Sequence, residues 1–314
     1  GTDLRDLASS LSTRVTLRAI EQRRGELLML HACGVADAEG RVAAFVGPSG
    51  RGKTTLVSTL ARHYGYVTDE TVGIDAEGAV VAYRKPLSVI DPATDSPHKT
   101  QVPPSALGLL PLPEAALGIA AVVLIDRRPG DAETVTVQDV PLAEAITRLV
   151  PEMSYLTDVP LPLQSLATLL DRVGGARQVQ YAEARAVVTA VPGLVASTPI
   201  AASPWSAVDV TAPAPAAGLY SRTPVQDGLA VDDALVLLRE RTVHVLEGIG
   251  PVLWRALSTP APREALVARA VEVFGEPEQG GAEELVQTAL DALVEAGLAV
   301  HPVPEPASEP EEES

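Results

Sequence analysis

The N-terminal part of the chain alternates between short apolar runs and segments with helical spacing. Residues 3–24 carry an apolar side chain every three to five positions, which predicts an amphipathic helix. Short apolar runs predict strands at 27–30, 42–46, 66–68, 72–74, 79–83, 120–125, 134–137 and 179–181. Helical spacing predicts helices at 54–64, 142–150, 163–173 and 184–191. Strands that alternate with helices indicate an α/β domain, which we place at 1–202.

Two stretches interrupt this alternation. Residues 85–114 are rich in proline and polar residues, which predicts a long loop of the kind that is often functional. Six prolines and many Ala and Ser residues occupy the stretch from Pro192 to Pro224. This composition predicts an extended linker, which we place at 203–223.

A second, smaller domain is predicted at 224–303. Its pattern indicates a hairpin with strands at 235–238 and 243–246, and a short final strand at 298–300. Helical spacing predicts helices at 248–257, 263–274 and 282–295. This order of elements indicates a small winged-helix α+β domain. Residues 304–314 consist mainly of Pro, Glu and Ser, which predicts a disordered acidic tail.

Composition narrows the function classes. The chain has 314 residues, is 46% hydrophobic and carries a net charge of −17, which disfavours nucleic acid as its main partner. Cys33 is the single cysteine, in keeping with a reducing cytoplasm. No apolar run is long enough to span a bilayer and no signal peptide is visible, so we expect a cytoplasmic protein without membrane contact. The chain begins with Gly instead of Met, consistent with a longer natural N-terminus.

The clearest motif is Gly47-Pro-Ser-Gly-Arg-Gly-Lys-Thr54, which matches G-x-x-x-x-G-K-[ST] and lies between a predicted strand and a predicted helix. Its backbone N–H groups and the helix start are suited to a phosphate. Lys53 is expected to reach the β- and γ-phosphates of ATP or GTP, and Thr54 to contact Mg²⁺. The predicted nucleotide-binding residues are Gly47, Ser49, Gly50, Arg51, Gly52, Lys53, Thr54 and Thr55.

Polar side chains also follow two other predicted strands. Asp69 and Glu70 come directly after the strand at 66–68, where a carboxylate can hold Mg²⁺ or accept a proton from an incoming hydroxyl. The alternative is a solvated turn. His31 ends the run at 27–30, and a lone histidine is more often structural than catalytic.

The stretch from His31 to Ile74 resembles the HPr kinase/phosphorylase superfamily, which has a leucine-rich strand ending in His, a P-loop, a helix and an acidic pair. The resemblance implies that Asp69 is the base or metal-linked aspartate, that Glu70 takes the second acidic place as a metal ligand, and that His31 lies near both. It extends more weakly through Lys85–Ser88 and Leu124–Gly130, where relatives have an arginine near the transferred phosphate, here Arg128 or its neighbour Arg127. Shorter relatives that phosphorylate lasso-peptide precursors are the closer likeness.

The C-terminal domain resembles PqqD, the RiPP recognition element, in the order and spacing of its elements. The resemblance implies that the leader of a precursor peptide adds a strand to the hairpin, at Thr242, Val243, His244, Val245 and Leu246. The alternatives are a DNA-binding winged helix or a structural cap. Residues 224–300 contain five Arg and thirteen Asp or Glu, which argues against DNA.

Together these patterns predict an ATP-dependent kinase of a ribosomally made precursor peptide, in which Asp69, His31, Lys53 and Arg128 are catalytic and Thr54 and Glu70 hold Mg²⁺. A second hypothesis is a nucleotide-regulated peptide carrier without phosphotransfer. A third is a kinase whose phosphate is a leaving group for dehydration. Other biosynthetic enzymes and further copies of the chain are possible partners.

Overall fold

The computed structural model describes residues 4–90, 99–128, 130, 133–196 and 204–301. The chain divides into two compact units, Gly1–Ser203 and Pro204–Ser314. The predicted acidic tail at 304–314 lies outside the described residues. Within the described ranges, none of the helices combines the length and the apolar character that a membrane crossing requires.

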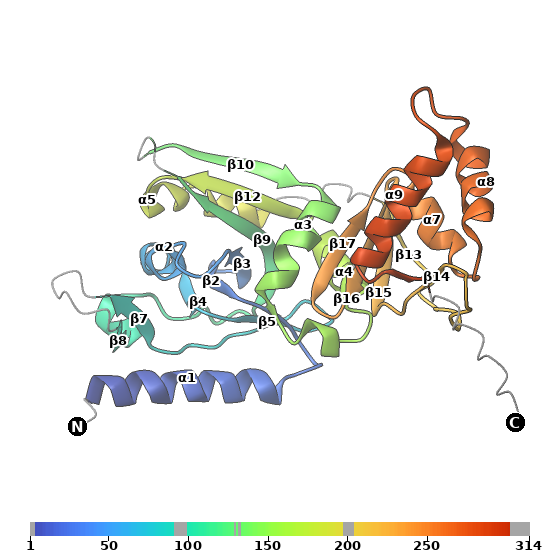
Figure 1. Cartoon of the computed structure of the whole chain (residues 1–314). Helices are drawn as coiled ribbons and strands as arrows, with labels where there is room; N and C mark the ends of the chain where they lie inside the picture. The colour runs from blue at the N-terminus through green and yellow to red at the C-terminus, as the bar shows by residue number, and fades with distance from the viewer. Residues whose placement is uncertain (1–3, 91–98, 129, 131–132, 197–203, 302–314) are drawn as a thin grey trace, which may run out of the picture. The chain divides into compact units, whose positions relative to one another are not determined.

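The first unit is a mixed α/β structure built on a six-stranded sheet with the order β10-β12-β9-β3-β2-β4 (Figure 1). The central strands β12, β9 and β3 run parallel, whereas β10 and β2 are antiparallel to their neighbours. The strands are β2 Ala32–Ala36, β3 Arg41–Val46, β4 Gly65–Thr68, β9 Gly118–Arg127, β10 Val135–Val140 and β12 Ala176–Tyr181. The sheet therefore confirms the predicted α/β class.

Three helices pack on this sheet: α2 Lys53–Leu60, α5 Ala184–Val187 and α6 Val191–Ala196. Phe45 on β3 and Leu56 and Leu60 on α2 are fully buried in the shared core. Each such side chain stabilises the fold by about 1.5–3 kcal/mol relative to exposure. This packing holds the end of β3 and the start of α2 in a defined position.

A smaller sheet with the order β11-β1-β5-β6 completes the unit. Its strands are β1 Leu28–Leu30, β5 Val72–Ile74, β6 Val80–Val81 and β11 Met153–Ser154, and the remaining α-helices are α1 Leu4–Gln22, α3 Leu142–Leu149 and α4 Pro162–Arg172. Short 3₁₀ turns lie at Pro104–Leu107, Val150–Glu152 and Leu156–Asp158. On α1, the apolar side chains of Leu7, Leu11 and Val15 are exposed, whereas Thr16 is buried beside the Tyr83 hydroxyl.

The predicted loop at 85–114 is wrong in part. Strands β7 Leu87–Ile90 and β8 Lys99–Val102 form an antiparallel hairpin, in which the Gln101 side-chain amide donates to the Ser88 hydroxyl at 2.8 Å. The prolines of this stretch lie outside the two strands, so they do not remove a ladder N–H. The high proline and polar content of residues 85–114 as a whole therefore hid two short strands within it.

The second unit is an α+β structure in which an antiparallel sheet, β13-β15-β16-β17, packs against three helices. Its elements are β13 Trp205–Ala207, β15 Asp227–Val231, β16 Ala234–Arg239, β17 Thr242–Leu246, α7 Gly250–Ala256, α8 Arg263–Phe274 and α9 Ala282–Glu295, and a two-strand ladder of β14 Ser221–Arg222 and β18 Ala299–Val300. Trp254 is fully buried at the centre of the core. The bounds of α8 and α9 are those that the sequence predicts.

The predicted linker at 203–223 also needs correction. Trp205–Ala207 pairs with β15 and Ser221–Arg222 pairs with β18, so much of the stretch is part of the second unit. Residues 197–203, which include the first residue of the predicted linker, lie outside the described ranges. A three-residue edge strand has too little periodicity to be seen in sequence, because its partner strand decides its conformation.

Candidate functional site

The P-loop joins the end of β3 to the start of α2, as the motif predicts. A Cβ at Gly47 would lie 2.6 Å from Ile125 Cγ1, so only glycine fits against β9 there. Gly52 has φ +90 and precedes α2 without a side-chain cap, which leaves the first helical N–H groups available to an anion. Lys53 is buried and donates to the Gly47 carbonyl. Ser49, Gly50, Arg51 and Thr55 are exposed on the loop, and Thr54 is half-buried.

Strand pairing brings His31 and the acidic pair to the same loop. Ala32 pairs with Val46, so His31 lies opposite the residue at which the P-loop begins. The Ala32 N–H donates to the Glu70 carbonyl at 3.1 Å, which places the acidic pair beside the same end of β2. Segments that are separate in sequence are therefore joined by the ladders of β2 with β3 and β4.

The acidic pair is not a solvated turn. Asp69 is only 5% exposed, and its carboxylate accepts from the Ser88 backbone N–H. Lys85 is also buried, and its ammonium lies 3.1 Å from Asp69 Oδ1 and 3.0 Å from Glu70 Oε2. The Tyr66 hydroxyl lies 3.4 Å from Asp69 Oδ1. A buried charge persists only where such partners compensate its desolvation.

Burial and charge set the protonation of the site. Burial, followed by the charge of Lys53, lowers the pKa of His31, so its imidazole is neutral at pH 7. Burial also lowers the pKa of Lys53, against the attraction of Glu152. Burial raises the pKa of Asp69, and the charge of Lys85 offsets this rise only in part. A carboxyl whose pKa moves toward neutrality is better suited to proton transfer than an exposed one.

Arg127 ends β9 and Arg128 follows it, and the two side chains have different surroundings. A Cβ built at Gly52 of the P-loop would lie 3.8 Å from Arg127 Nη1. Arg128 instead pairs with Asp126 at 2.7 Å. Because successive strand residues point to opposite faces, Arg127 shares the face of Ile125 that packs on the loop. The structure thus brings Arg127 close to the phosphate loop, and it pairs Arg128, the first choice from sequence, with Asp126.

Sequence reasoning gave no role to two charged residues of the site. Lys85 is one of only three lysines and begins the Lys85–Ser88 stretch of the resemblance, but neither feature placed it beside the acidic pair. Glu152 carries no sequence signal. It lies opposite His31 because the pairing of Leu30 with Met153 extends by one residue, where the His31 N–H donates to the Glu152 carbonyl at 2.6 Å.

The oxygen atoms of the site suit a Mg²⁺ ion that is shared with a nucleotide. Mg²⁺ in phosphate sites is held by one or two carboxylates, waters and phosphate oxygens. Thr54, Asp69 and Glu70 offer oxygen ligands of this kind next to the phosphate loop. Within the described part of the chain, no group of three or more His, Cys, Asp or Glu side chains lies together in a way that could hold a metal ion, so an ion here would take one or two carboxylates and further oxygen ligands.

In the second unit, β17 is an edge strand of its sheet and pairs with β16 alone among the described strands. Val245 is exposed, whereas Leu246 packs against the core. In a hairpin with a two-residue turn the ladder bonds alternate along the strands, so Val243 and Val245 direct their N–H groups to the open edge. These outward N–H groups make the edge competent to accept another strand. On the same strand, burial and then the charge of Arg239 lower the pKa of His244.

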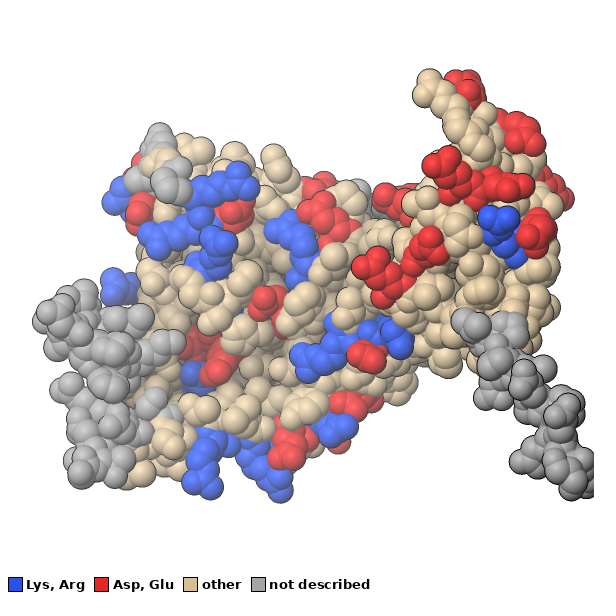
Figure 2. Space-filling view, viewed as in Figure 1, with Lys and Arg blue, Asp and Glu red and all other residues tan. Residues whose placement is uncertain are grey.

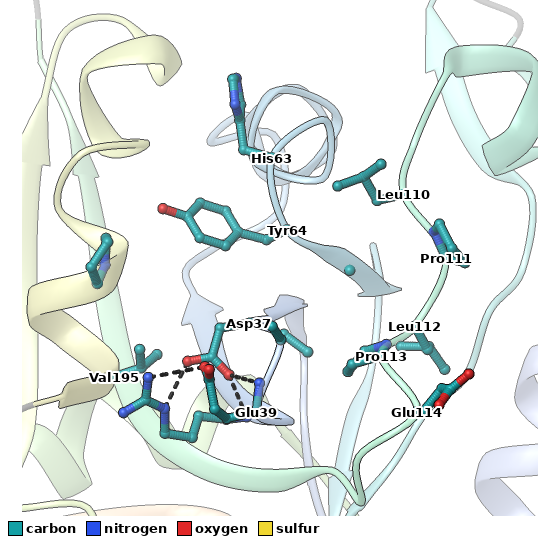
Figure 3. A pocket seen from close by; sticks show the side chains of 15 residues that line it. Asp37, Glu39, His63, Tyr64, Leu110, Pro111, Leu112, Pro113, Glu114 and Val195 are labelled. Carbon is teal, nitrogen blue, oxygen red and sulfur yellow. Dashed lines mark hydrogen bonds and ion pairs between the residues drawn. The ribbon is translucent and has the colours of Figure 1, made fainter.

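A cavity of about 820 Å³ lies at the other end of the first unit's sheet (Figure 3). It is bordered by the turn before β3 and by His63 and Tyr64 after α2, with Leu110, Pro111 and Pro113 across from them. Asp37 at its floor is held by Arg41 at 2.7 Å. The P-loop follows the opposite end of β3, so this cavity does not belong to the phosphate site.

Comparisons with known proteins add little to this geometry. No protein-family model matches the sequence, and no curated protein matches it. Among solved structures, the HPr(Ser) kinase/phosphatase from Coxiella burnetii is similar, with a TM-score of 0.27 and 10% identity, over 53% of this chain and 93% of that one. A likeness with this TM-score decides neither fold nor function.

Proposed function

We propose that the chain is an ATP-dependent kinase that phosphorylates a Ser or Thr hydroxyl of a ribosomally made precursor peptide. The observation that carries this proposal is the meeting of a complete P-loop, the buried Asp69 and the half-buried His31 at one end of a sheet. Burying a charge costs free energy, and a protein that only binds nucleotide gains nothing from that cost. A kinase gains a group that orients an incoming hydroxyl and accepts its proton.

Each side chain has a role in this proposal. The P-loop N–H groups and Lys53 bind the phosphates, and Arg127 adds positive charge on the same face. Asp69 orients and deprotonates the acceptor hydroxyl, while the neutral His31 accepts a hydrogen bond beside it. Thr54 and Glu70 are the residues that would hold Mg²⁺, which supplies positive charge to the phosphate oxygens when it is bound.

The second unit is proposed to bind the leader of the peptide as an added strand at β17, in the manner of a PqqD-like recognition element. The outward N–H groups of Val243 and Val245 support this mode. Binding the leader on the same chain raises the local concentration of the acceptor residue at the kinase site. The acidic charge of the second unit, which Figure 2 shows gathered over α8 and α9, favours a basic leader.

The test is intact-mass spectrometry of the precursor peptide encoded nearest the gene, after incubation with the protein, ATP and Mg²⁺. We expect a gain of one phosphoryl group that disappears with Lys53→Ala, and fragmentation then gives the acceptor. Arg62→Ala is the matched control, because it deletes a cation just beyond the C-terminal end of α2, and it should leave the mass gain intact. A gain that survives Lys53→Ala would contradict the proposal.

The alternative is a nucleotide-regulated peptide carrier. The ion pair between Lys85 and Asp69 Oδ1 favours it, because an ammonium stabilises the charged carboxylate and makes it a weaker base. This alternative expects ATP to change the affinity for the peptide without any phosphopeptide, which the same incubation and a binding titration separate.

A further inference from the structure

Lys85 occupies an unusual position between the two candidate acids. Its ammonium lies 3.1 Å from Asp69 Oδ1 and 3.0 Å from Glu70 Oε2, and its side chain is 6% exposed. Its backbone carbonyl is 3.2 Å from the Tyr66 hydroxyl, which anchors the residue just before β7. One buried cation thus bridges two adjacent carboxylates.

The two carboxylates differ in access to solvent. The side chain of Asp69 is 3% exposed and that of Glu70 is 39% exposed. Asp69 also accepts from Ser88 and lies near the Tyr66 hydroxyl, so it is held from several sides. The Glu70 carboxylate pairs with Lys85. Of the two ion pairs, the one with Glu70 is the one that a cation arriving from solvent can replace.

We propose that Lys85 is a positioning residue that competes with the divalent cation for Glu70. Without metal it keeps Glu70 turned toward Asp69. When metal binds, Lys85 releases Glu70 and keeps its contact with Asp69, which stays oriented toward the acceptor. The proposal concerns the acidic pair of the proposed kinase site, but it requires no phosphoryl transfer.

The physical reason is that an ammonium and a metal ion seek the same oxygen. Two like charges side by side repel, so a lone acidic pair in a buried setting needs a counter-ion. Lys85 is this counter-ion when no metal is bound. A metal ion gains Glu70 only by displacing this counter-ion, so its affinity for the protein is lowered by the strength of that ion pair.

The experiment is a titration of the full chain with Mn²⁺, without nucleotide or peptide. Electron paramagnetic resonance measures the concentration of free Mn²⁺ at each step of the titration. We expect Lys85→Gln to bind Mn²⁺ about tenfold more tightly than the natural protein, which corresponds to about 1.4 kcal/mol. Lys85→Arg keeps the positive charge and should stay close to the natural affinity. Lys99→Gln removes the same charge from β8 and should also stay close to it, which controls for net charge.

The gain must depend on Glu70. The double variant Lys85→Gln, Glu70→Gln should lose the tighter binding. An unchanged or weaker affinity in Lys85→Gln would overturn the proposal, and so would a gain that persists in the double variant. Because no nucleotide is present, these outcomes do not depend on whether the protein transfers a phosphate.

A measurement on the natural side chain covers the case in which Lys85→Gln does not fold. The chain has only three lysines, so NMR of lysine labelled at its side-chain end gives few signals, which Lys53→Arg and Lys99→Arg assign. We expect Mg²⁺ to shift the Lys85 signal in the natural protein and not in Glu70→Gln. A Lys85 signal that is insensitive to Mg²⁺ in the natural protein would overturn the proposal.

Discussion

Both units bury basic side chains, and two of these, Lys85 in the first unit and Arg222 in the second, have different surroundings. In the second unit, Arg222 lies over the Trp254 ring at 4.5 Å and donates to the Thr211 carbonyl at 2.6 Å. It also pairs with Asp209, whose side chain is 71% exposed. In the first unit, Lys85 faces only the acidic pair and the backbone next to it. Arg222 contacts an aromatic ring, a backbone carbonyl and an exposed acid. Lys85 instead contacts two carboxylates that could also bind a metal ion or a substrate.

This difference separates a structural cation, Arg222, from the cation for which we propose a function, Lys85. The planar guanidinium of Arg222 stacks on an aromatic ring and satisfies a backbone carbonyl, so it belongs to the core. The compact ammonium of Lys85 serves as a counter-ion beside a phosphate loop. Burial alone therefore does not mark a functional residue; the partners of the buried charge do.

Asp69→Asn should have the largest effect. We expect phosphoryl transfer to the peptide to fall by about 10²–10⁴-fold, because the amide cannot accept the hydroxyl proton. Nucleotide affinity should change little, since the P-loop is intact. Single-turnover transfer from labelled ATP measures the first quantity and calorimetry the second. Asp209→Asn removes the acid beside Arg222 and is the matched control. An equal loss of transfer in Asp209→Asn would show that the effect is not specific to the acidic pair.

Trp254→Ala tests the structural side of the comparison. Truncating this fully buried ring should cost about 3–5 kcal/mol in the stability of the second unit. Urea unfolding followed by circular dichroism measures the loss. Nucleotide binding by the first unit should persist, and its disappearance would show that the two units do not carry the separate tasks assigned here.

Arg127→Ala and Arg128→Ala form a matched pair of neighbouring residues. Removal of Arg127 should lower transfer by about 10²-fold, the usual cost of losing one cation at a developing charge. Removal of Arg128 should cost far less, because the guanidinium beside Gly52 of the loop belongs to Arg127. Transfer rates at saturating ATP decide between them, and the reverse order would exchange their roles.

Val245→Pro should weaken peptide binding by about tenfold, because proline removes an N–H from the open edge of β17. Phosphorylation of a leaderless acceptor peptide should not change. Fluorescence anisotropy of a labelled leader measures the affinity. Glu247→Pro, just beyond the strand, is the control. Equal affinity of Val245→Pro and the natural chain would place the leader elsewhere.

Cys33 gives the smallest expected signal. Burial raises the pKa of its thiol to about 12, so at pH 8 the native protein holds almost no thiolate. We expect no labelling by iodoacetamide until denaturant is added, as monitored by mass spectrometry. Rapid labelling of the folded protein would mean that the β2 end of the site is open to solvent.

Local patterns in the sequence predicted several parts of this molecule. The P-loop was visible because its glycines, lysine and threonine are neighbours in the chain and their geometry is a property of one turn. Helices α8 and α9 were visible because their apolar spacing repeats over three or more turns. The β7–β8 hairpin and the strands β13 and β14 were missed, since each is short and depends on a partner strand.

What the sequence by itself determined is therefore the phosphate loop, the α/β class of the first unit and the long helices of the second. Only the tertiary structure decided that Lys85 pairs with Asp69 and Glu70, that Glu152 lies opposite His31, and that Arg127 lies close to Gly52 of the loop. The physical reason is that these contacts join separate segments through strand register and side-chain direction, and neither leaves a repeating pattern in the chain.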